Sequence, residues 1–208
     1  MHKALIVDDH PFIRATVRML LAGAKVEVIG EADNGPQAIA LARDHLPDLI
    51  VLDIAIPRLD GMEVIHRLNT MGLRSRILVL TSQPAEVYAE RCRRAGVDGY
   101  FSKTGELTDL TKAFRTVLAG KEYYPRLATS SVVGPDVQSA DMALIKQLSN
   151  KELVILQQLA LGKSNKMISQ EMLLSSKTIS TYKTRLLEKL QLSSVIYLAD
   201  FAKRNNLI

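Results

Sequence analysis

Short apolar runs alternate with amphipathic stretches five times along residues 1–121. The apolar runs, about 4–8 residues long and rich in Ile, Val and Leu, are typical of strands buried inside a parallel sheet. The alternation predicts an α/β domain with a five-stranded, doubly wound parallel sheet that is covered on both faces. We expect the strands near 3–8, 26–30, 49–53, 77–81 and 98–101, and the helices near 11–23, 35–45, 61–71, 84–95 and 106–119.

The pattern changes after this region. Residues 123–140 contain several Pro, Gly and Ser residues without a clear period, so we interpret them as a linker. Beyond Asp141 no strand pattern recurs, and helical spacing continues to the end. We therefore expect an α/β domain over 1–121, a linker over 122–143 and an all-α domain over 144–208.

Acidic residues end two of the expected strands. Asp8 and Asp9 follow the first apolar run, and Asp53 ends the third. Because the carboxyl ends of parallel strands form the ligand crevice of such a sheet, these carboxylates are expected in one pocket. Like charges that lie close together repel unless a cation sits between them, and Mg²⁺ prefers oxygen ligands of this kind.

Two further strands bring polar side chains to the same edge, namely Thr81 and Lys103. Three carboxylates, a hydroxyl and an ammonium suit an aspartyl phosphate. Asp53 is the expected nucleophile, and Asp8 and Asp9 are expected to hold Mg²⁺. Lys103 is expected to pair with one phosphoryl oxygen, and Thr81 to donate a hydrogen bond to another. Polar strand ends are common in α/β domains, but four of them in order favour a phosphoacceptor site.

These residues belong to a longer pattern, which consists of Val7-Asp8-Asp9-His10, Leu52-Asp53, Pro57, Asp60-Gly61, Thr81, Gly99-Tyr100 and Lys103. On this pattern, residues 1–121 resemble the receiver domain of bacterial two-component response regulators, which has a flavodoxin-like fold. The resemblance implies that a sensor histidine kinase or a phosphotransfer protein phosphorylates Asp53. It also implies that Thr81 and Tyr100 form a switch pair.

The resemblance further implies a defined set of metal ligands. Mg²⁺ would be bound by Asp9, Asp53 and the backbone carbonyl of Ala55, with Asp8 reaching the ion through water. No cofactor other than Mg²⁺ is expected.

The helical part begins with a strong start signal. Ser149-Asn-Lys-Glu152 is a capping box, in which the serine hydroxyl accepts from the Glu152 amide and the glutamate reaches back. This helix is expected to stop at Gly162, and Ser164 is expected to cap a short second helix. A tight turn at 174–176 then leads into a third helix, through about Leu190. Two helices joined by a short turn at this spacing indicate a helix-turn-helix.

The third helix is the candidate reader of DNA. Hydroxyls and long cations on one face are what a helix in the major groove needs. A polar surface on an ordinary helical bundle is the alternative. From 146 to 208, however, ten Lys and Arg residues stand against four Asp and Glu, a net charge of +6, whereas 1–121 carries +1. This asymmetry points to a polyanionic partner. The apolar face carries Ile179, Leu186, Leu187 and Leu190, and the polar face Lys177, Ser180, Thr181, Lys183, Thr184 and Arg185.

A second family pattern covers this part, and it consists of Leu148-Ser149, Glu152, Ile155-Leu156, Gly162, Asn165-Lys166, Ile168, Leu174-Ser175, Lys177-Thr178-Ile179 and Lys189-Leu190. These residues resemble the LuxR-type helix-turn-helix, and nearly the whole chain resembles the NarL/FixJ family of response regulators. The resemblance implies double-stranded promoter DNA as a partner. The implied DNA-binding set has Ser180, Thr181 and Thr184 at base edges, Lys166, Lys177, Lys183 and Arg185 mostly on phosphates, and Thr178 beside them.

The hydroxyls at 180 and 184 depart from the family pattern, because several members have Lys there. Short hydroxyl side chains discriminate bases poorly, and they contact phosphate or water as readily. The operator sequence therefore cannot be carried over from the family.

The last helix is expected to begin near Ser194. Its apolar residues Val195, Leu198 and Ala199 have helical spacing. Packing within the monomer accounts for this face, whereas the family resemblance implies that the helix is a dimer contact. Both interpretations remain open from the pattern.

We expect a cytoplasmic, phosphorylation-controlled transcription factor that forms a homodimer when phosphorylated. The single Cys92 excludes an intramolecular disulfide, and no apolar run approaches the ~18 residues of a membrane helix. One alternative makes the receiver a phosphorylation-independent dimerisation module. Another is a phosphate-ester hydrolase working through Asp53, but Ala55 stands where an Asp-x-Asp motif needs its second carboxylate. We therefore do not expect an enzyme that acts on an external substrate.

Overall fold

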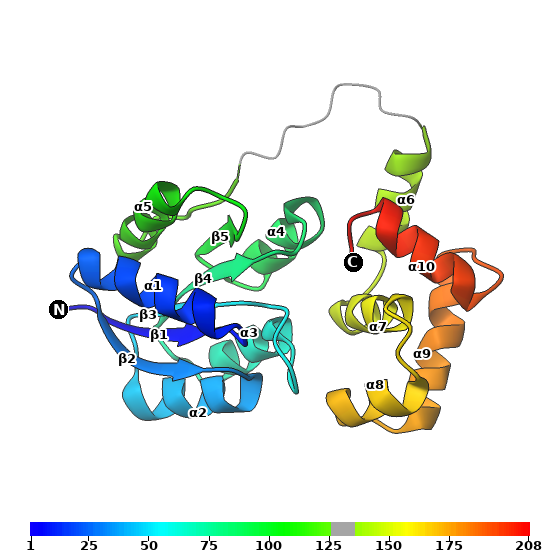
Figure 1. Cartoon of the computed structure of the whole chain (residues 1–208), viewed down its shortest axis with the longest axis horizontal. Coiled ribbons are helices and arrows are strands. Elements are labelled where there is room, and N and C mark those ends of the chain that lie inside the picture. The colour runs from blue at the N-terminus through cyan, green and yellow to red at the C-terminus, as the bar shows by residue number, and fades with distance from the viewer. Residues whose placement is uncertain (126–135) are drawn as a thin grey trace. The chain divides into compact units, whose positions relative to one another are not determined.

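Five parallel strands form the centre of the N-terminal unit in the computed structural model, which describes residues 1–125 and 136–208 and leaves out the side chains of 136–139. Each strand lies within two residues of its expected bounds. The carboxyl ends of β1, β3, β4 and β5 lie along one edge, because these strands are parallel neighbours. The strands are β1 (Lys3–Val7), β2 (Glu27–Ala32), β3 (Leu49–Leu52), β4 (Arg76–Thr81) and β5 (Gly99–Ser102), in the order β2-β1-β3-β4-β5 (Figure 1).

Five helices connect and cover these strands, again close to the expected ranges. Local signals set where two of them begin. The Asn34 side chain accepts from the Gln37 amide at 3.1 Å, and the Asp60 side chain accepts from the Glu63 amide at 3.1 Å. The helices are α1 (Pro11–Gly23), α2 (Gly35–His45), α3 (Gly61–Thr70), α4 (Ala85–Arg94) and α5 (Leu107–Leu118).

The core of this unit follows from the alternation of side chains along each strand. β1 and β3 are buried over almost their whole length, as expected for central strands of a doubly wound sheet. One sheet face packs against α1 and α5, and its cluster includes Ala4, Ile6, Leu49, Val51, Leu78, Leu80 and Phe101 from the strands with Val17, Leu21, Leu110, Ala113, Phe114 and Val117 from the two helices.

Within residues 136–208, the regular elements of the C-terminal unit are all helices. Its elements are α6 (Asp136–Lys146), α7 (Asn150–Ala160), α8 (Asn165–Met172), α9 (Ser176–Lys189) and α10 (Val195–Arg204). The predicted capping box is present, since the Ser149 hydroxyl accepts from the Glu152 amide at 3.2 Å and Glu152 accepts from the Ser149 amide at 2.8 Å. Ser164 and Ser175 cap α8 and α9 through their hydroxyls alone, which accept from the Met167 and Thr178 amides. Buried side chains from α7, α8, α9 and α10 form the core.

The expected linker over 122–143 contains regular structure at both of its described ends. Tyr123 pairs with Gly99 as an added parallel bridge beside β5. The range 136–143 lies in α6, a helix that the sequence did not reveal because its apolar period is weak. Residues 126–135 lie outside the described part of the chain. The contact map divides the chain into units of Met1–Leu127 and Ala128–Ile208, and the exact domain boundaries stay a prediction.

Within residues 1–125 and 136–208, no helix combines the length and the apolarity needed to cross a bilayer.

Candidate functional site

Backbone pairing at the carboxyl edge of the sheet gathers the acidic residues. Val7 is paired with Leu52, so Asp8 and Asp53, the next residues, stand side by side. The Asp53 amide donates to the Val7 carbonyl at 2.8 Å, and the Asp8 amide donates to the Ala32 carbonyl at 3.0 Å. The two carboxylates are therefore fixed by the ladder itself.

Lys103 bridges these two carboxylates. Its Nζ lies 2.5 Å from Asp53 Oδ2 and 2.7 Å from Asp8 Oδ2. Both carboxylates are buried, and the Lys103 side chain is 10% exposed. The second oxygen of Asp53 accepts from the Ala55 amide at 2.9 Å. Burial acting alone lowers the pKa of Lys103, but the charges and hydrogen bonds of Asp53 and Asp8 outweigh it and hold this pKa above its ordinary value. Lys103 is therefore the resident cation of the pocket.

Asp9 and His10 complete the cluster at its rim. His10 Nδ1 lies 2.8 Å from Asp9 Oδ1 and 3.2 Å from Asp8 Oδ1. One ligand atom from each of Asp8, Asp9, His10 and Asp53 lies within 4.8 Å of the others. Asp9 Oδ1 is buried and, despite the nearby imidazole, accepts no aligned hydrogen bond from the described residues. The oxygen-rich part of this cluster suits a hard cation.

The predicted switch residues lie beside the pocket. Thr81 is fully buried at the end of β4, its carbonyl accepts from the Lys103 amide at 2.9 Å, and its hydroxyl accepts from the Gln83 amide at 3.3 Å. The Tyr100 side chain is also fully buried, and its hydroxyl donates to the Gln83 carbonyl at 2.6 Å. Burial first, and then the surrounding negative groups, raise the pKa of Tyr100, so its hydroxyl remains a donor. Tyr100 thus already occupies an inward position here.

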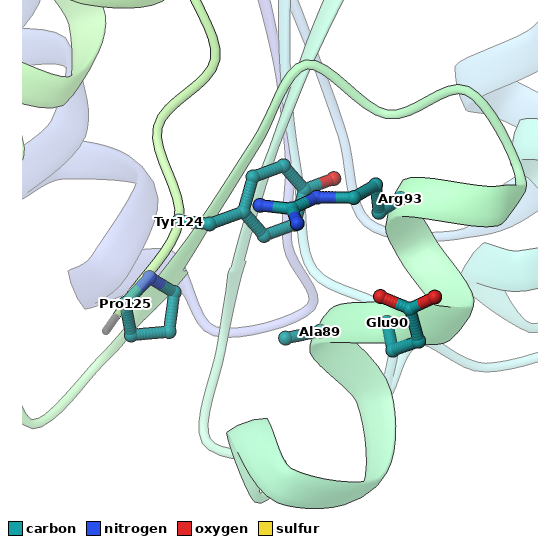
Figure 2. A pocket seen from close by; sticks show the side chains of 5 residues that line it. All are labelled: Ala89, Glu90, Arg93, Tyr124 and Pro125. Carbon is teal, nitrogen blue, oxygen red and sulfur yellow. The ribbon is translucent and has the colours of Figure 1, made fainter. Parts of the chain in front are cut away.

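Tyr123 and Tyr124 hold the segment that follows α5 against the N-terminal unit, and we call this pair the clasp. The sequence pattern did not predict it. The Tyr100 amide donates to the Tyr123 carbonyl at 2.7 Å, and the Tyr124 hydroxyl donates to the Val97 carbonyl at 2.7 Å. Figure 2 shows the Arg93 side chain crossing the Tyr124 ring, with its guanidinium 4.2 Å from the ring centre. A cavity of about 220 Å³ opens here, lined by Ala89, Glu90, Arg93, Tyr124 and Pro125.

The second candidate site is the polar face of α9. Ile179 and Leu186 are fully buried and fix this helix on its unit, while Leu187 is only partly buried. The Ser175 hydroxyl accepts from the Thr178 amide at 3.0 Å and starts the helix. Among the predicted DNA-binding residues, those at Lys166, Lys177, Ser180, Thr181, Thr184 and Arg185 are exposed, and Thr178 and Lys183 are partly buried.

The hydroxyls on α9 are hydrogen-bonded to their own helix. Thr181 donates to the Lys177 carbonyl at 3.1 Å, and Thr184 donates to the Ser180 carbonyl at 3.2 Å. Ser180 donates to the Ser176 carbonyl at 3.1 Å and also accepts from Asn165 Nδ2 at 3.0 Å. The Ser180 side chain therefore also links α9 to α8.

The three residues of α10 that were predicted as a dimer contact differ in burial. Leu198 is fully buried, so its side chain packs inside the unit, and Val195 and Ala199 are partly buried. The exposed apolar side chains of α10 are Ile196 and Tyr197, at 77% and 52%. Neither was named from the sequence, because helical spacing alone does not say which face the rest of the unit covers.

Together the two units define a class of protein, the receiver-linked transcription regulators. Proteins of this class have an acidic pocket at the edge of a doubly wound sheet, and a helix-turn-helix follows in the same chain. Residues 4–115 match the response regulator receiver domain, and residues 146–202 match the LuxR family of bacterial regulatory proteins. The chain belongs to the two-component response regulators with a LuxR-family DNA-binding domain. This family consists of transcription regulators, and the protein is not an enzyme.

Relatives match over nearly the full length. The chain is 50% identical over 206 residues to BvgA of Bordetella pertussis, named a putative positive transcription regulator of virulence factors, with 99% of each chain covered. It is 31% identical over 204 residues to the DNA-binding transcriptional activator EvgA of Escherichia coli, with 98% of each covered. The solved RcsB response regulator of Salmonella typhimurium has the same fold, at a TM-score of 0.76, 24% identity and 98% coverage of both chains.

Proposed function

We propose that Asp53 accepts a phosphoryl group from a sensor histidine kinase or a phosphotransfer protein, and that this raises the affinity of the C-terminal unit for promoter DNA. The observation that carries the proposal is the pairing of the Asp53 carboxylate with Lys103 Nζ at 2.5 Å, beside Asp8. A buried carboxylate next to a fixed cation is a nucleophile whose product, an acyl phosphate, keeps a charge partner.

The acidic pocket is proposed to hold Mg²⁺ through Asp8, Asp9, Asp53 and the backbone carbonyl of Ala55. The donor set fits, because it consists of oxygen atoms and includes the buried Asp9 Oδ1, which lacks an aligned hydrogen-bond donor among the described residues. Bound there, the ion would neutralise charge on the phosphoryl oxygens. His10 stays at the rim, since a hard cation prefers carboxylate oxygen to imidazole nitrogen.

Lys103 changes partner in this scheme. Before phosphorylation its ammonium bridges Asp8 and Asp53. After phosphorylation it pairs with a phosphoryl oxygen, and the Thr81 hydroxyl donates to another. The phosphoryl group adds about −1.5 to −2 charge units and three acceptor oxygens, so both donors gain a stronger partner.

The signal is proposed to leave the receiver through Thr81, Tyr100 and the clasp. Tyr100 is already inward, so phosphorylation would stabilise an arrangement that the unmodified chain also reaches. The Tyr100 amide holds the Tyr123 carbonyl, and any shift of β5 at this residue therefore moves the start of the linker. We infer that the clasp connects the switch to the DNA-binding unit.

On the C-terminal unit, α9 is proposed to enter the major groove, with Ser180, Thr181 and Thr184 toward the bases. Lys166, Lys177, Lys183 and Arg185 would contact phosphates, with Thr178 beside them. EvgA is named a DNA-binding transcriptional activator, which supports DNA as the partner. The phosphorylated chain is proposed to be a homodimer with α10 in the contact. We expect it to act in the cytoplasm, which suits the free, buried Cys92.

The test measures DNA affinity of the full chain with and without Mg²⁺ and beryllofluoride, a phosphoryl mimic. The probe is a duplex selected from a random-sequence pool by the full chain. We expect beryllofluoride to raise the affinity by about 5- to 150-fold, the usual range of such coupling. Asp53→Asn is expected to lose this gain and to abolish labelling by acetyl phosphate, while exposed Asp109→Asn keeps both.

An affinity that beryllofluoride leaves unchanged would instead support a receiver that serves as a phosphorylation-independent dimerisation module. Labelling of Asp53→Asn at another residue would overturn the assignment of the phosphoacceptor.

A further inference from the structure

Two exposed threonines on α9 turn their hydroxyl hydrogens back onto the helix. Thr181 Oγ1 lies 3.1 Å from the Lys177 carbonyl, and Thr184 Oγ1 lies 3.2 Å from the Ser180 carbonyl. Residues three apart share one helix face, so both threonines belong to the same patch. The helix backbone therefore occupies the only hydrogen that each hydroxyl can donate.

This arrangement fixes what each threonine offers outward. A hydroxyl has one hydrogen and two lone pairs, so its remaining capacity is that of an acceptor. The Cγ2 methyl takes another of the three staggered positions on Cβ, and it stays accessible because both threonines are exposed. Each threonine thus presents an acceptor and an apolar group together, whereas the sequence alone left donor and acceptor roles open.

Ser180 differs from its two neighbours. Its hydroxyl donates to the Ser176 carbonyl at 3.1 Å and receives a hydrogen bond from Asn165 Nδ2 at 3.0 Å. It has no methyl, and one of its two lone pairs is already used. Ser180 therefore positions α9 against α8, and the acceptor-plus-methyl face belongs to Thr181 and Thr184.

We propose that Thr181 and Thr184 each select an A·T base pair. This inference rests on the proposed placement of α9 in the major groove and adds which bases the helix selects. In that groove adenine N6 is a donor and thymine carries the C5-methyl, so one A·T pair satisfies the acceptor and the methyl of one threonine. Guanine offers only acceptors there, and cytosine offers an amine without the methyl. The adjacent cations Lys183 and Arg185 then bind phosphates without competing for these bases.

The experiment uses the full chain loaded with Mg²⁺ and beryllofluoride, and duplexes that it selects from a random-sequence pool. In the selected site, each thymine is replaced by uracil, which lacks the methyl, and each adenine by 2-aminopurine, which lacks the N6 amine. We expect at least two A·T pairs at which uracil weakens binding about fourfold, which is the loss of affinity expected when one buried methyl group is removed. At the same pairs 2-aminopurine is expected to weaken binding about threefold or more.

Two variants then assign one of these pairs to Thr184. Thr184→Ser keeps the hydroxyl and removes the methyl, so it is expected to lose the sensitivity to uracil at one pair and to keep the sensitivity to 2-aminopurine there. Thr184→Val keeps a methyl and removes the acceptor, so the reverse is expected. Thr116→Val on α5 of the receiver is the matched control. The Thr116 hydroxyl also donates to the carbonyl four residues earlier, that of Lys112, at 2.8 Å.

The outcomes separate the two levels of the proposal. A selected site with G·C pairs under these threonines, or sensitivities that both Thr184 variants leave as in the wild type, would overturn the A·T assignment while DNA binding stands. A chain that enriches no sequence and binds duplexes without dependence on salt would overturn the proposed function, and this inference with it.

Discussion

The backbone amide of Tyr100 donates to the carbonyl of Tyr123 at 2.7 Å. Tyr100 lies in β5 beside the acidic pocket, and Tyr123 lies beyond α5 where the chain leaves the receiver. The Tyr123 amide in turn donates to the Asp98 carbonyl at 3.0 Å, so the exit segment continues the sheet as a short additional pairing. The proposed switch residue and the start of the linker are therefore one hydrogen bond apart.

Tyr124→Phe tests the clasp. The change removes the hydrogen bond to the Val97 carbonyl and keeps the ring under Arg93. We expect a loss of about 1 kcal/mol in the free energy of unfolding of the receiver, the usual value of one hydrogen bond. We also expect a smaller gain in DNA affinity from beryllofluoride, because the linker start is held less firmly.

The measurements are calorimetric unfolding and DNA titration of the full chain. Tyr197→Phe is the control for unfolding, since Tyr197 is 52% exposed. Thr116→Val, which loses one side-chain hydrogen bond on α5, is the control for the DNA titration. Equal stability of Tyr124→Phe and Tyr197→Phe would show that the hydrogen bond from the Tyr124 hydroxyl to Val97 does not stabilise the receiver.

Asp141→Asn tests how the C-terminal unit holds α6. The Asp141 carboxylate accepts from Arg204 at 2.5 and 2.9 Å and from Asn205 at 2.9 Å. Burial alone raises the pKa of Asp141, but the hydrogen bonds from Arg204 and Asn205 outweigh it and place this pKa below its ordinary value. The stability from this group is therefore present above the ordinary pKa of about 3.9 and is lost as the pH falls through the lowered value.

At pH 7, Asp141→Asn is expected to destabilise the C-terminal unit by about 1–3 kcal/mol, since charged hydrogen bonds are lost. In acid the difference from the wild type should shrink, because the wild-type carboxyl then becomes protonated as well. Denaturant unfolding of the full chain across this pH range measures both effects. Exposed Glu188→Gln on α9 serves as the control. A difference that did not change with pH would refute the ionic role.

Lys183→Ala and Arg185→Ala test the phosphate contacts. Each is expected to weaken binding to all duplexes alike and to lower the slope of log affinity against log salt by about 1, because one fewer counterion is released. Titrations at several salt concentrations measure the slope, with Lys121→Ala on the receiver as the control. A change in sequence preference without a change in slope would place these residues at bases.

Ile196→Lys tests the dimer contact on α10. Ile196 is 77% exposed, so the change should leave the stability of the monomer nearly unaltered while placing a charge in the proposed interface. We expect the beryllofluoride-loaded chain to shift from dimer to monomer in sedimentation, and DNA affinity to fall. Met19→Lys on α1, at a residue that is 66% exposed, is the matched control. A dimer that tolerated Ile196→Lys and broke with Met19→Lys would move the interface to the receiver.

The sequence by itself determined the strands, the helices other than α6, and the gathering of the acidic residues. Apolar runs and helical spacing are local patterns, and caps such as Ser149 and Asp60 act within a single turn. Asp8 and Asp53 could be placed together from the sequence, because parallel strands share one carboxyl edge. The helix-turn-helix was predicted from two helix starts, at Ser149 and Ser164, and from the tight turn at 174–176, which are all local signals.

Only the tertiary structure decided how these elements use their side chains. The sequence placed Lys103 at the same sheet edge as Asp53, but it did not predict that Lys103 pairs directly with this carboxylate. Arg204 reaches Asp141 across 63 residues, which no local period encodes. The same holds for Leu198, whose burial depends on the helices packed over α10. The inward Tyr100 and its hydrogen bond to Tyr123 also depend on how distant segments pack. Packing fixes these roles, because it selects one partner for each group among many that are far away in sequence.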